Sequence, residues 1–146
     1  MKLNQLSVFL ENKPGQLKMA CQLLAEANIS ILTLSLADTK QFGILRLIVS
    51  NWESAQAILE KAGFISKVTE VAAVEVADRP GGLFQILQAI EACGLNVEYM
   101  YAFTFGRGNQ AVLIFRFDDV DAAIIKLQEK GVNFVAGADL FARANG

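Results

Sequence analysis

Apolar positions along the chain follow two periods, and the same order of segments occurs twice. Apolar residues spaced three or four positions apart predict amphipathic helices, and short runs rich in β-branched and aromatic residues predict strands. The first half predicts helices carrying 17–24 and 52–59, and strands over 6–10, 29–37, 44–49 and 64–68. The second half predicts helices carrying 83–90 and 120–127, and strands over 71–77, 95–105, 111–117 and 132–136. Each half therefore has the order strand, helix, strand, strand, helix, strand.

An internal repeat underlies this order. Asn12-Lys13-Pro14-Gly15-Gln16-Leu17 aligns with Asp78-Arg79-Pro80-Gly81-Gly82-Leu83, and these segments hold the only 2 prolines of the chain. Residues 28–31 align in the same way with 94–97. The extra residues of the second copy fall in the turn at 105–109. A duplicated unit predicts two domains, 1–69 and 70–146, with no flexible linker between them, so we expect the halves to pack on each other.

This order predicts an α+β protein made of two ferredoxin-like βαββαβ units. In each unit, two helices are expected to cover one face of a four-stranded antiparallel sheet. Gly63 and Gly131 follow the second helix of each unit and are expected to be its C-cap glycines. Because a unit of this size buries a limited core, we expect the units to be joined side by side.

Composition restricts the possible functions. The 146 residues are 53% hydrophobic, carry a net charge of −2 and include 0 histidines. The charge gives no reason to expect nucleic acid or an anionic membrane as a partner. Without histidine, the commonest general base and metal ligand are absent. We therefore expect no cofactor, metal site or catalytic residues. Neither a signal-peptide core nor a long apolar run is found, so we expect a cytoplasmic protein.

The repeated proline–glycine turn is the main candidate for binding chemistry. Proline fits the first turn of a helix, where its missing N–H has no partner in any case, and glycine leaves the helix start uncovered. The free N–H groups there attract a carboxylate. Asn12 or Asp78 would receive an ammonium group or cap the helix. On the residues alone, a purely structural turn into a helix is the favoured interpretation.

Both turns, the βαββαβ order and the entries into the second strands at 29–31 and 95–97 resemble the ACT domain family. The resemblance covers nearly the whole chain. It implies a regulatory module that binds an amino acid between two paired domains. The residues that it implies as ligand contacts are Asn12 and Gly15, Asp78 and Gly81, and Ser30 or Asn96. We expect no enzyme domain on this chain, so the resemblance implies a separate partner protein, such as a metabolic enzyme or regulator.

The two copies differ at these positions. If the halves pair, Asn12 faces Asn96, and two amides suit a zwitterion. Asp78 would face Ser30, and its carboxylate would repel that of a ligand, so this second site is expected to be weaker or vestigial. The candidate ligand-binding residues are Asn12, Lys13, Pro14, Gly15, Gln16, Leu17, Asn96, Val97, Ser30, Asp78, Arg79, Gly81 and Gly82.

Other segments have simpler interpretations. Tyr99, Tyr101, Phe103 and Phe105 alternate and are expected to form one face of a sheet, with Tyr99 and Met100 as candidates for side-chain selectivity. Glycines at 105–109 indicate a hairpin tip, because the lysine and helix of a phosphate loop are missing. The acids Asp118, Asp119 and Asp121 fit helix capping. Cys21 and Cys93 are expected to be buried, unreactive thiols.

We therefore expect a non-enzymatic amino-acid sensor that forms a homodimer and controls a separate partner. A small enzyme on the same scaffold would need an acid–base pair or nucleophile in a cleft, and the pattern predicts none. An RNA-binding module would need a basic, aromatic sheet face, and the corresponding motif is absent. A pure protein-interaction module remains the alternative if no amino acid binds.

Overall fold

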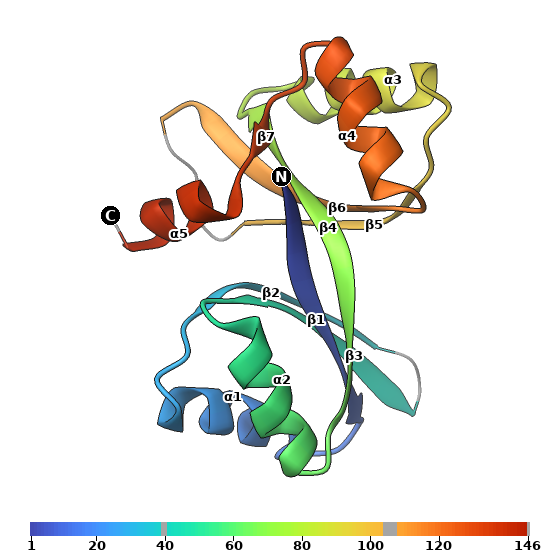
Figure 1. The fold of residues 1–146 in the computed structure, drawn as a ribbon. Coiled ribbons are helices and arrows are strands. Elements are labelled where there is room, and N and C mark those ends of the chain that lie inside the picture. The colour runs from blue at the N-terminus through green and yellow to red at the C-terminus, as the bar shows by residue number, and fades with distance from the viewer. Residues whose placement is uncertain (39–40, 104–107, 146) are drawn as a thin grey trace. The chain divides into compact units, whose positions relative to one another are not determined.

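The chain divides into two units, which are described here one at a time (Figure 1). The computed structural model describes residues 1–38, 41–103 and 108–145. We call Asn4–Thr69 the N-terminal unit, and Met1–Leu3 together with Glu70–Gly146 the C-terminal unit. The helices are α1 (Gln16–Glu26), α2 (Trp52–Lys61), α3 (Gly82–Ala92), α4 (Val120–Glu129) and α5 (Gly137–Asn145). The strands are β1 (Lys2–Glu11), β2 (Ile31–Asp38), β3 (Phe42–Val49), β4 (Ile65–Ala77), β5 (Val97–Ala102), β6 (Gln110–Phe117) and β7 (Phe134–Val135).

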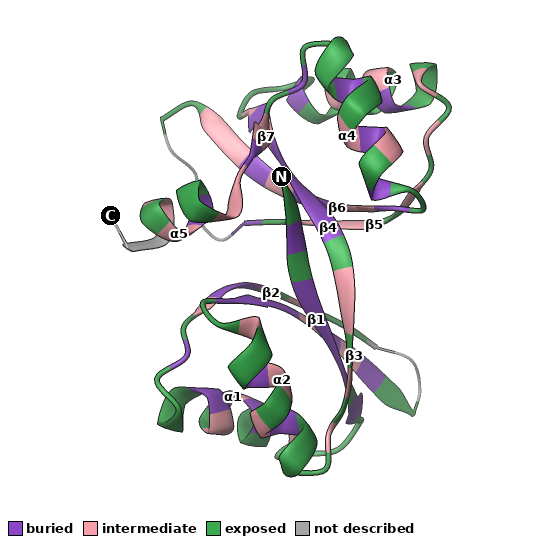
Figure 2. Ribbon diagram, in the orientation of Figure 1, coloured by how far each residue is buried: buried purple, intermediate pink, exposed green. Residues whose placement is uncertain are grey.

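In the N-terminal unit, the antiparallel sheet runs in the order β2-β3-β1. Alternate residues of β1 and β3, such as Leu6, Val8, Leu45 and Leu47, point to one face and are fully buried, as period-2 patterning predicts. Helices α1 and α2 contact each other and cover this face (Figure 2). The core of the unit is thus a single layer of leucine and valine between the sheet and these two helices.

In the C-terminal unit, the order is β4-β6-β5, and β7 also pairs with β4. Helices α3 and α4 cover the face that carries Val74, Val76, Phe115 and Phe117. The two phenylalanine rings stack with their centroids 5.6 Å apart. The tandem ferredoxin-like fold expected from the sequence is confirmed in both units.

Strand β4 differs from the expectation of two separate strands over 64–68 and 71–77. It runs without a break for 13 residues and contributes its first residues to the N-terminal unit and the rest to the C-terminal unit. The reason lies in the residues between: Ser66–Val71 contains no glycine, proline or asparagine that would favour a turn. The two copies therefore share a strand rather than a linker.

An ion-pair cluster connects the first residues of the chain to the rest of the C-terminal unit. Lys2 Nζ lies 2.9 Å from Glu70 Oε2 and 3.1 Å from Asp121 Oδ1. Hydrogen bonds to these two carboxylates raise the pKa of Lys2 above its ordinary value. Strand β1, like β4, is thus divided between the units.

The expected strand over 132–136 is wrong in its extent. Only Phe134 and Val135 pair as β7, and a helix that the sequence pattern did not predict, α5, follows at once. Leu140 of α5 is 1% exposed, and Arg143 of α5 forms an ion pair with Glu75 of β4. Burial of Leu140 and this ion pair stabilise a helix in place of a longer strand.

Helix ends follow the expected capping chemistry. Gly63 and Gly131 adopt φ of 95° and 84°, and Phe64 and Val132 donate back to the last helical turn, as in a Schellman motif. At the start of α4, Asp119 Oδ1 accepts from the Ala122 N–H at 3.0 Å, which confirms a capping role for this acidic cluster. Within the described part of the chain, no helix is both long and apolar enough to cross a bilayer.

Candidate functional site

The turn between β1 and α1 has a defined geometry that only glycine fits well. The Gln16 N–H donates to the Lys13 carbonyl at 3.4 Å, and Gly15 has φ 92° and ψ −17°. With Pro14 before it, this is a type II turn, which requires positive φ at its third residue. The second copy repeats the turn, with Gly81 at φ 86° and ψ −6°. Glycine is therefore needed at Gly15 and Gly81 for its backbone conformation, a reason that the sequence analysis did not give.

The helix starts at these turns differ from the other two helix starts of the repeat. Helices α2 and α4 begin at Asn51 and Asp119, whose side chains accept from backbone N–H groups. Helices α1 and α3 begin at Gly15 and Gly81, which have no side chain to cap the first turn. The Gln16 and Gly82 N–H groups donate within their turns, and the next N–H groups have no acceptor within the helix, so the positive end of each helix is open to another partner.

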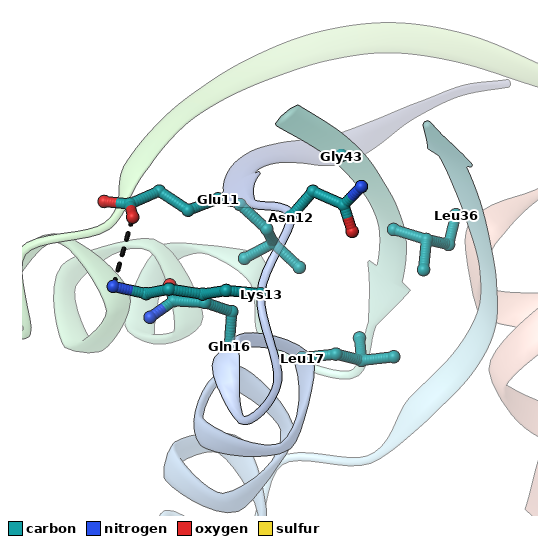
Figure 3. A pocket seen from close by; sticks show the side chains of 8 residues that line it. Glu11, Asn12, Lys13, Gln16, Leu17, Leu36 and Gly43 are labelled. Carbon is teal, nitrogen blue, oxygen red and sulfur yellow. Dashed lines mark ion pairs between the residues drawn. The ribbon is translucent and has the colours of Figure 1, made fainter. Parts of the chain in front are cut away.

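A surface pocket of about 90 Å³ lies beside the first turn, entirely within the N-terminal unit. The turn and its flanks line one side of it, and the β2–β3 hairpin lines the other. Its lining residues are Leu10, Glu11, Asn12, Lys13, Gln16, Leu17, Leu36 and Gly43. Figure 3 shows Lys13 and Gln16 extending together toward Glu11, whereas Asn12 and Leu17 extend toward Leu36. The pocket thus has a charged and polar side and an aliphatic side.

Charges at this pocket are balanced. Lys13 Nζ lies 3.1 Å from Glu11 Oε2, and both side chains are more than half exposed. The backbone fixes the turn to the hairpin, because the Asn12 N–H donates to the Gln41 carbonyl at 3.1 Å. The Lys13 N–H donates to the Glu11 carbonyl at 2.9 Å. These bonds hold Asn12 at the mouth of the pocket.

The two copies differ in how closely the helix approaches the strand before it. In the second copy, a Cβ placed on Gly82 would overlap the carbonyl oxygen of Ala77. The corresponding position in the first copy is Gln16, whose side chain lines the pocket. Helix α3 therefore starts directly against the end of β4, a closer packing than a residue with a side chain permits.

The remaining predicted residues lie just before the second strand of each unit. Ser30 is exposed, and its N–H donates to Ser50 Oγ at 3.0 Å. Asn96 is exposed before β5, and Val97 is half-buried and pairs with Phe117. Asn12 and Ser30 belong to the N-terminal unit, whereas Asp78 and Asn96 belong to the C-terminal unit. The pairing of Asn12 with Asn96 stays a prediction.

The structure brings Asn12, Lys13, Gln16 and Leu17 together at the pocket, as the sequence grouped them. Sequence reasoning missed four other residues that line it, namely Leu10, Glu11, Leu36 and Gly43. Gly43 pairs with Leu10 across β3 and β1. The available signal was the hairpin: an antiparallel register carried back from its turn places Leu36 near the start of β3, whereas no local signal places β3 beside β1.

The other predicted features are placed as follows. Tyr99 and Tyr101 are half-buried and Phe103 is buried, and they alternate with the residues that face α3 and α4, as expected of one sheet face; Phe105 lies outside the described residues. Cys21 and Cys93 are free thiols, but both are half-buried rather than buried. The hairpin tip at 105–109 is described only from Gly108 onward.

Comparison with known proteins identifies the family. The profile of the ACT domain pair matches residues 1–144. The chain belongs to this family. This ACT domain pair is similar to protein BT0572 from Bacteroides thetaiotaomicron, with 38% identity, 97% of this chain and 96% of that chain covered, and a TM-score of 0.90. No curated protein matches it.

Two further structures share the fold of this ACT domain pair. The regulatory subunit of aspartate kinase from Thermus thermophilus is 17% identical, with 86% of this chain and 91% of that chain covered and a TM-score of 0.64. The corresponding subunit from Thermus flavus is 16% identical, with 86% and 90% covered and a TM-score of 0.61. At these identities the likeness establishes the fold.

Proposed function

We propose that this ACT domain pair is a non-catalytic regulatory protein that binds a free amino acid at the Asn12–Leu17 turn and thereby controls a separate partner protein. The observation that carries the proposal is the pocket beside this turn, which combines polar groups of both charges with an aliphatic wall. Two solved structures of the same fold are regulatory subunits of aspartate kinase, and this precedent supports a regulatory role.

The ends of a free amino acid match the polar side of the pocket. A carboxylate is stabilised by the uncapped first turn of α1 and by Lys13. An ammonium group is stabilised by the Asn12 carbonyl oxygen and by Glu11. The lysine and glutamate already pair with each other at 3.1 Å. A zwitterion can bind between these two side chains, with its carboxylate beside Lys13 and its ammonium group beside Glu11.

We propose Asn96 as the contact from the other domain and the Asp78 turn as the weaker of the two sites. Asp78 and its exposed carboxylate would oppose the carboxylate of a ligand. The close packing of Gly82 on Ala77 also leaves less room between strand and helix there. Both observations favour the first turn over its copy.

Regulation follows if ligand binding favours one arrangement of the domains over another, and a partner that binds that arrangement responds to the ligand. Strands β1 and β4 each contribute residues to both units, so the strand that leads into the Asn12 turn is continuous with residues of the other unit. The proposed homodimer would add a second copy of the same site.

The first test is thermal unfolding with each of the twenty amino acids, followed by calorimetric titration of any that stabilises the protein. A ligand at about 100 times its dissociation constant adds about 2.7 kcal/mol to the free energy of unfolding, which raises the midpoint by several degrees. Asn12→Ala should abolish most of this shift, whereas Asp78→Ala, at the matched position of the other copy, should retain it. Absence of any shift at millimolar concentrations would refute the proposal.

A protein-interaction module is the second candidate, and one observation favours it. Helix α3 exposes three apolar side chains, with Leu83 at 39%, Phe84 at 62% and Leu87 at 38% exposure. Such a patch is typical of a surface that another protein covers. If Phe84→Glu converts a dimer into a monomer in light scattering, this face joins two copies of the chain. If the mass of the Phe84→Glu variant equals that of the wild type, the patch is available to a different partner protein.

A further inference from the structure

We infer that the pocket beside the Asn12 turn selects an uncharged amino acid with a short aliphatic side chain, and that Leu36 and Gly43 set the upper limit of its size. This inference rests on the proposed function, because it assigns the ligand class of the same site. Neither Leu36 nor Gly43 belongs to the turn motif; both come from the β2–β3 hairpin.

The size of the pocket limits how much of a side chain it can hold. Its volume is about 90 Å³. An apolar cavity of about 150 Å³ accommodates benzene. A phenylalanine or tryptophan side chain would therefore extend beyond this pocket into solvent, whereas the one to three side-chain carbons of alanine, 2-aminobutyrate or valine fit within it.

The chemistry of the walls excludes charged side chains. The aliphatic side consists of Leu10, Leu17 and Leu36. The charged groups in the lining, Glu11 and Lys13, form an ion pair with each other. An acidic or basic ligand side chain would therefore meet either leucine or a pair without net charge, and it would gain no unpaired opposite charge. Among the described residues that line the pocket, none has an aromatic ring to stack on a ligand.

Gly43 keeps the aliphatic side open. It lies on the same face of β3 as the buried Leu45 and Leu47, and its own position on that face has no side chain. A Cβ there would lie 3.2 Å from Leu36 Cδ1, closer than ordinary contact. An added methyl group would therefore both occupy the pocket wall and press against Leu36. Leu36 is 50% exposed, so it can shift by the few tenths of an ångström required without unfolding the hairpin.

The test measures dissociation constants by calorimetry for a ladder of glycine, alanine, 2-aminobutyrate, valine, norleucine, phenylalanine, lysine and glutamate. The expected order places 2-aminobutyrate or valine at least tenfold tighter than phenylalanine, lysine and glutamate. Leu36→Ala should increase the affinity for norleucine relative to that for valine by threefold or more, because it removes the wall that limits side-chain length. Gly43→Ala should weaken valine more than alanine.

A matched control is available on the same strand. Leu34 lies two positions from Leu36 on the same face of β2 and is 41% exposed, but it does not line the pocket. Leu34→Ala should leave the order of affinities for these amino acids unchanged. The inference is overturned if an aromatic or charged amino acid binds tightest, or if Leu36→Ala and Leu34→Ala act alike. Those results would be compatible with the proposed function, whereas failure of all amino acids to bind would refute both the proposed function and this inference.

Discussion

Arg143 Nη2 lies 3.2 Å from Glu75 Oε2, and this ion pair connects helix α5 to strand β4. The two side chains are 20% and 24% exposed, so the pair is shielded from water on most sides. Together with the buried Leu140, it fixes the one helix of the structure, among the residues described, that the repeat does not explain. The attachment of α5 can therefore be tested through this pair.

Arg143→Met is expected to lower the free energy of unfolding by about 1–2 kcal/mol, because Glu75 then keeps a partly buried charge without its partner. Urea denaturation measures the change. The double variant with Glu75→Gln should recover part of the loss, since no unpaired charge remains. Lys13→Met, which breaks an exposed ion pair with Glu11, is the control and should cost at most about 0.5 kcal/mol. Equal losses for the two ion pairs would mean that shielding has no role.

Gly15→Ala and Gly81→Ala are each expected to destabilise the protein by about 1–2 kcal/mol, because an L-residue is strained at the positive φ of the type II turn. Asparagine tolerates this conformation better, so Gly15→Asn should cost less. Chemical denaturation of the three variants checks this order. Only the changes at Gly15 should also weaken amino-acid binding. A Gly15→Ala variant as stable as the wild type would contradict the assigned turn.

Gly82→Ala should destabilise the protein by about 1–3 kcal/mol, because the new Cβ overlaps the carbonyl oxygen of Ala77 and α3 must move away from β4. Gln16→Ala is the matched change in the first copy, where a residue with a Cβ is already present. It should alter stability by no more than about 0.5 kcal/mol. Thermal unfolding of both variants separates the two turns, and a neutral Gly82→Ala would show that the copies pack alike.

Much of the fold follows from the sequence because the relevant signals are local. Period-3.6 and period-2 apolar patterns fix the helices and strands. Gly63 and Gly131 mark helix ends through a conformation that glycine adopts at low cost. The duplication doubles each signal, so the Asn12 and Asp78 turns support each other.

The features that sequence reasoning missed depend on residues far apart in the chain. Helix α5 is stabilised by Glu75, which precedes Arg143 by 68 positions. The pocket wall at Gly43 and Leu36 depends on the register of three strands. The long β4 could have been predicted locally, because no turn-forming residue separates the two apolar runs, but the repeat favoured a boundary there.

Lys2→Met is expected to destabilise the C-terminal unit in a way that depends on pH. Hydrogen bonds to Glu70 and Asp121 raise the pKa of Lys2 in the folded protein above its ordinary value of 10.5. A raised folded pKa means that the contribution of Lys2 to stability is fully present below 10.5 and is lost as pH rises through the folded value. The difference in unfolding free energy between wild type and variant should therefore be constant from pH 7 to about 9.5 and shrink at higher pH. Added salt should also reduce it, because the groups are exposed. Lys18→Met, on the exposed surface of α1, controls for general loss of a positive charge. A difference that persists above the folded pKa would mean that Lys2 acts through the packing of its aliphatic chain rather than through its charge.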